Sequence, residues 1–68
     1  MFVLTVAGMN EQSHRHLTAA IQSQDPKARI EIKLTERLVY VETKAELEKI
    51  KRALENDGYR VAHSEMRP

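Results

Sequence analysis

Apolar and polar side chains alternate along several stretches of the chain, which is typical of β-strands because successive side chains of a strand point to opposite faces. In the first stretch, FVLTVA, Phe2, Leu4 and Val6 share one face. A second stretch, ARIEIKL, places isoleucines at alternate positions with charged side chains between them. The alternation predicts strands over residues 2–7, 28–34 and 38–42, and a weaker one over residues 60–66.

Between the first two predicted strands, the apolar residues change to the three- and four-residue spacing of a helix. This stripe is made of Leu17, Ala20 and Ile21. Either Asn10 or Ser13 can serve as the N-cap, since both side chains accept hydrogen bonds from the free N–H groups of a first helical turn. Pro26 ends the pattern, so a helix is predicted over roughly residues 12–23.

A second helical stripe follows the third predicted strand and consists of Leu47, Ile50 and Leu54. Thr43 and Glu46 have the spacing of a capping box, in which the threonine is the N-cap and the glutamate is the third helical residue. Gly58 suits the left-handed backbone conformation that closes many helices. We therefore expect this helix to begin directly after Thr43 and to run to about Asn56.

The predicted order is strand, helix, strand, strand, helix, strand. The short connection between residues 34 and 38 favours an antiparallel hairpin. This order predicts an α+β, ferredoxin-like βαββαβ fold, with a four-stranded antiparallel sheet and both helices on one face. Sixty-eight residues leave space for a single domain, residues 1–68.

Composition excludes several classes of function. Eleven basic and ten acidic residues leave a net charge of +1, and only Phe2, Tyr40 and Tyr59 are aromatic, which argues against nucleic-acid binding. The sequence has no apolar run that could cross a membrane or form a signal peptide, so a cytoplasmic location is expected. No nucleophile–base pair, Gly-rich phosphate loop or HExxH motif is present, so we do not expect an enzyme.

Three short motifs carry a family resemblance: Val6-x-Gly8-Met9, Asp25-Pro26, and Asn56-Asp57-Gly58-Tyr59. In these features the chain resembles the heavy-metal-associated (HMA) domain, the fold of small copper chaperones and of the N-terminal domains of metal-pumping ATPases. The resemblance covers about residues 2–62. It implies a ferredoxin-like metal-binding protein whose partner is a metal-transport ATPase or another protein. The chain itself is expected to be a monomer or a weak homodimer through an edge strand.

The chain departs from this family at the metal site. The family motif is Gly-Met-x-Cys-x-x-Cys, whereas this chain has no cysteine. Counting from Gly8-Met9 places Glu11 and His14 at the two cysteine positions. Counting from the helical stripe places Asn10 and Ser13 there, with one residue lost from the loop, and we favour this alignment because the helix has to bury its stripe. Neither alignment supplies a thiolate for Cu(I).

A harder metal site is conceivable at the same place. Glu11 and His14 are three residues apart, and a carboxylate with an imidazole suits Zn(II), Ni(II) or Cu(II). His16 is a poorer third ligand, because two helical positions differ by about 200° around the axis. The competing interpretation makes His14 a packed side chain at the edge of the stripe, His16 a solvated residue and Glu11 a partner of the helix dipole.

The remaining candidates would support a metal or contact a partner protein. They are Met9, Asn10, Ser13 and Tyr59. The family resemblance implies that Met9 packs inward beneath the loop and that Tyr59 lies near it and shields the ion. The alternative role of Tyr59 is the hydrophobic contact that accompanies a glycine helix end. Two functions therefore remain: weak binding of a divalent transition metal, or metal-independent protein binding at this end of the fold.

Overall fold

A computed structural model describes residues 1–68 and shows the predicted order of elements. They are β1 (Phe2–Ala7), α1 (Ser13–Gln24), β2 (Arg29–Lys33), β3 (Leu38–Glu42), α2 (Leu47–Asn56) and β4 (Arg60–Met66). The boundaries of β1, β3 and β4 coincide with the predicted ones, and those of α1 and β2 differ by one residue at each end. Neither helix is long and apolar enough to cross a lipid bilayer.

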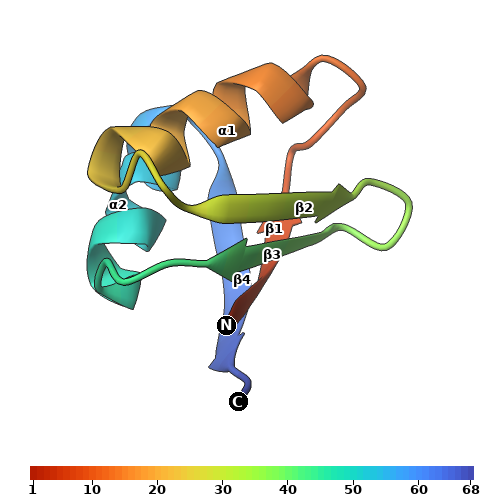
Figure 1. Ribbon diagram of the computed structural model, residues 1–68. Helices are drawn as coiled ribbons and strands as arrows, with labels where there is room; N and C mark the ends of the chain where they lie inside the picture. Colours follow the sequence, from red (N-terminus) through yellow and green to blue (C-terminus); the bar gives the residue numbers. More distant parts are fainter.

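The four strands form one antiparallel sheet in the order β2-β3-β1-β4, and α1 and α2 lie together on one side of it (Figure 1). The central strand β1 pairs with β3 through Leu4 and Val39, and with β4 through Leu4 and Ser64. A register shift between Thr5 and Val6 interrupts the second pairing. This arrangement confirms the ferredoxin-like fold.

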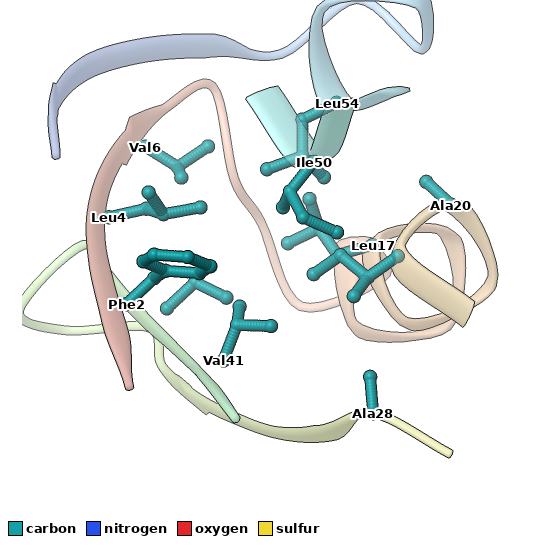
Figure 2. Packing of buried hydrophobic residues seen from close by; sticks show 11 residues of the cluster. Phe2, Leu4, Val6, Leu17, Ala20, Ala28, Val41, Ile50 and Leu54 are labelled. Carbon is teal, nitrogen blue, oxygen red and sulfur yellow. The ribbon is translucent and has the colours of Figure 1, made fainter. Parts of the chain in front are cut away.

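Side chains from the inner face of the sheet and from both helices form the core (Figure 2). The largest fully buried residues are Leu4, Val6, Leu17, Val39, Val41, Ile21, Ile50 and Leu54. On the other face, Arg29, Glu31 and Lys33 of β2 are exposed. In β2 and in both helices, the apolar side chains therefore face the core and the charged ones face solvent, as predicted.

The predicted capping box at the start of α2 is wrong. The helix begins at Leu47, and its N-cap residue, Glu46, makes no side-chain capping bond. The hydroxyl of Thr43 instead donates to Asp25 Oδ2 at 2.6 Å and accepts from the Ala45 N–H at 3.0 Å. Asp25, which is 18 residues away in the sequence, therefore binds the threonine hydroxyl that was predicted to cap the helix.

Asp25 ties the end of α1 to the connection between β3 and α2. The hydrogen bond from Thr43, followed by one from the Lys27 N–H, lowers the pKa of Asp25 below its ordinary value of 3.8. A lowered pKa in the folded state stabilises the fold above the unfolded pKa, and this contribution is lost as the pH falls through the folded pKa. We therefore expect Asp25→Asn to lower the melting temperature at neutral pH, with a smaller difference from wild type at pH values below about 4.

Thermal unfolding followed by circular dichroism at several pH values measures this difference. Glu42→Gln is the matched control, because the Glu42 carboxylate forms no ion pair or hydrogen bond. A difference between Asp25→Asn and wild type that stays constant from neutral to acidic pH would contradict the assignment.

Candidate functional site

The connection from β1 to α1 and the residue before β4 lie at the same edge of the sheet. Ala7 pairs with Arg60 at the end of the β1–β4 ladder, so the chain leaves β1 at Gly8 beside the point where it enters β4 from Tyr59. Gly8 has φ = +90°, a backbone conformation that favours glycine. We refer to residues 8–16 together with Tyr59 and Arg60 as the loop end.

Asn10 and Ser13 bind each other reciprocally within the loop end. The Asn10 N–H donates to Ser13 Oγ at 2.8 Å, and the Ser13 hydroxyl donates to Asn10 Oδ1 at 3.2 Å. Asn10 Oδ1 also accepts from the Gln12 N–H at 2.8 Å, and the Ser13 N–H donates to the Asn10 carbonyl at 3.0 Å. The two side chains thus satisfy the N–H groups of Asn10 and Gln12 in the turn that precedes α1, whose N-cap, Gln12, makes no side-chain capping bond.

The burial of Ser13 bears on the two alignments of the loop with the helix. Ser13 is only 3% exposed and lies one helical turn before Leu17, so it is the first residue of the buried stripe of α1. The two sequence alignments differ in which residue occupies this inward position, and the inward residue is Ser13. The geometry therefore agrees with the alignment that pairs Asn10 with Ser13.

The three candidate metal ligands are all solvent-exposed. Glu11, His14 and His16 line one open depression of about 450 Å³, together with Gln12 and Arg15. The packed interpretation of His14 is wrong, because Ser13 holds the buried place and one further residue turns about 100° around the helix axis. No three histidine, aspartate or glutamate side chains converge into a group that could hold a metal ion.

The loop end does not fit a soft ion. Cu(I) prefers sulfur ligands, and the sulfur in this segment belongs to Met9, which packs against the hydrophobic core as the family resemblance implies. Asn10 and Ser13 offer neutral oxygens that already bind each other. Glu11 and His14 are chemically suited to a divalent ion, but two ligands fall short of the four that a structural zinc site uses.

Tyr59 has a structural role at the end of α2. The Gly58 N–H donates to the Glu55 carbonyl at 3.0 Å, and the Tyr59 N–H donates to the Leu54 carbonyl at 3.1 Å. These two bonds and the φ of +92° at Gly58 define a Schellman motif at the end of α2. The half-buried Tyr59 packs against the core, which is the hydrophobic contact expected after such a helix end.

The prediction of Asn10 or Ser13 as the N-cap of α1 is wrong, because the N-cap is Gln12 and Ser13 is the first helical residue. Sequence reasoning also missed that Asn10 and Ser13 act as a reciprocal pair. It also missed Gln12, which lines the depression beside the candidate ligands. Two signals were available for the pair: the separation of three residues, and the position of Ser13 four residues before Leu17.

Comparisons with known proteins agree with the fold. No family model and no curated protein matches this sequence. A solved structure described as "Crosstalk between Cu(I) and Zn(II) homeostasis" aligns with a TM-score of 0.82 and 27% sequence identity, over 87% of this chain and 95% of that chain. The chain therefore has the ferredoxin-like fold of a metal-homeostasis domain.

Proposed function

We propose that this chain is a small metal-handling protein of the HMA type, without enzymatic activity, that binds a divalent transition-metal ion as cargo at its loop end. His14 and Glu11 would be the ligands, with His16 as a third, and Zn(II), Ni(II) or Cu(II) the ion. The observation that carries the proposal is that these three side chains share one open depression. The similarity to a structure from Cu(I) and Zn(II) homeostasis supports a role in metal handling.

The same geometry indicates weak and reversible binding. The three side chains are exposed, and His14 and His16 are two positions apart in α1, about 200° around the helix axis, so His16 is the poorest of the three ligands. An ion held by Glu11 and His14 would keep most of its water ligands. Such a site suits transfer to a partner, such as a metal-transport ATPase in the cytoplasm, better than permanent storage.

An NMR titration of the metal-free protein with Zn(II), Ni(II), Cu(II) and Ag(I), the last as a surrogate for Cu(I), tests the proposal. We expect saturable shifts or line broadening at residues 11–16 with the divalent ions. His14→Ala should abolish them, whereas His63→Ala should not, because His63 is exposed in β4 opposite Thr5. Spectra unchanged at millimolar metal would contradict metal binding.

A second candidate function is supported by the pair of Asn10 and Ser13. Asn10 and Ser13 bind each other and leave no free ligand at their positions. The loop end therefore needs no metal ion there in order to bind another protein. Arg15, His16 and Arg60 are exposed there and give the surface a basic character that suits an acidic partner. Binding to a metal-transport ATPase domain that persists in a chelator would favour this function, and binding that requires the ion would favour the first.

A further inference from the structure

We propose that the hydrogen bonds between Asn10 and Ser13 close the loop without a metal ion, and that these two residues occupy the positions where the HMA family carries its metal-binding cysteines. The loop end then keeps its folded shape in the metal-free protein. This inference is independent of the proposed function, because it holds whether or not Glu11 and His14 bind an ion.

The first argument is that the pair satisfies its own polar groups. Asn10 Oδ1 accepts two hydrogen bonds, one from the Gln12 N–H and one from the Ser13 hydroxyl. Ser13 Oγ donates one bond and accepts another from the Asn10 N–H. An ion at either oxygen would have to replace these bonds with a contact to a neutral ligand, in a place where Ser13 is almost fully buried.

The second argument is the direction of the side chains. Ser13 Oγ and Asn10 Oδ1 lie 3.2 Å apart, so these two positions direct their side chains toward each other from the loop and from the first turn of α1. Glu11 and His14 are both exposed and form no ion pair, the one ion pair of the chain being Arg67–Glu65. A two-thiolate site requires side chains that converge, and the contact between Ser13 Oγ and Asn10 Oδ1 shows that this pair does so.

Installing the missing cysteines tests the assignment of positions. We expect the reduced double variant N10C/S13C to bind one Ag(I) per chain at least about tenfold more tightly than the matched double variant E11C/H14C. Isothermal titration under anaerobic conditions measures both affinities, and circular dichroism checks that each variant is folded. Equal or tighter binding by E11C/H14C would overturn the assignment, as would binding by N10C/S13C no tighter than by the wild type.

Amide hydrogen exchange in the presence of a chelator tests the closure of the loop, and the two bonds with amide donors each have their own reporter. Ser13→Ala removes the acceptor of the Asn10 N–H, so we expect the exchange of that amide to increase about tenfold. Asn10→Ala removes the acceptor of the Gln12 N–H and should increase the exchange of that amide instead. Asn10→Asp keeps an acceptor oxygen and should preserve protection of the Gln12 amide.

Exchange of the β1 amides in the same samples shows whether a variant has only opened locally. Because Asn10 is exposed, Asn10→Ala should remain folded even where Ser13→Ala does not. The proposal fails if the Asn10 and Gln12 amides of the wild type are unprotected in the chelator and become protected only after Zn(II) is added. It also fails if Asn10→Ala leaves the exchange of the Gln12 amide unchanged.

Discussion

Leu54→Ala and Ile50→Ala are each expected to lower the free energy of unfolding by about 2–5 kcal/mol. Both side chains are fully buried between α2 and the sheet (Figure 2), so truncation loses apolar contacts and leaves a cavity. A domain of 68 residues has a total stability of about 3–10 kcal/mol. Either change therefore removes a large fraction of the stability, and the more costly of them can unfold the chain.

Urea unfolding and thermal unfolding measure this effect. For a domain of this size, a loss of 2 kcal/mol corresponds to a decrease of about 8 °C or more in melting temperature. Leu34→Ala is the matched control, because Leu34 is 37% exposed in the turn between β2 and β3. If Leu54→Ala and Ile50→Ala were no more destabilising than Leu34→Ala, the packing of α2 described above would be wrong.

Gly58→Val is expected to destabilise the fold by about 2 kcal/mol, and Gly58→Ala by about 1 kcal/mol. A Cβ atom at Gly58 would meet no heavy atom within 4 Å, so the effect does not come from a steric clash with neighbouring residues. It comes from the φ of +92°, which side chains with a Cβ rarely adopt and branched ones least of all. Relaxation of this angle would break the bond from the Tyr59 N–H to the Leu54 carbonyl.

Equilibrium unfolding of both variants measures the cost, and hydrogen exchange of the Tyr59 amide reports on the helix end directly. Gly58→Asn should be less destabilising than Gly58→Ala, because asparagine tolerates the left-handed conformation. Asp57→Ala, at the neighbouring residue with an ordinary φ of −87°, should change stability by less than about 0.5 kcal/mol. Wild-type stability in Gly58→Val would rule out the Schellman motif.

The absence of cysteine removes the thiolate ligands that would bind a soft metal ion. The chain shares the architecture of a structure from Cu(I) and Zn(II) homeostasis but contains no thiolate to bind a soft ion. The loop that resembles the metal loop is present and internally hydrogen-bonded. The remaining chemistry of the loop end is that of exposed carboxylate and imidazole groups, which are the ligands named in the proposed function.

The hydrophobic pattern alone was sufficient to predict the fold. The alternation in β2 and the stripe of α2 place the apolar side chains on one face of each element, and the order of apolar residues is enough to identify that face. The start of α2 was predicted incorrectly, because Thr43 and Glu46 match a local rule while Asp25 competes for the threonine hydroxyl. Local spacing carries no information about a hydrogen-bonding partner from another element.

The sequence by itself determined the order of elements, the buried faces and the lack of any thiolate ligand, because each follows from residue types and their spacing along the chain. The tertiary structure decided which loop residues face inward, because the burial of Leu17 against the core sets the rotation of α1 and turns Ser13 toward Asn10. That rotation also places His14 in solvent, and Glu11 is exposed in the turn before α1. A candidate metal site that is ambiguous in sequence is therefore resolved into a hydrogen-bonded pair and an exposed set of candidate ligands.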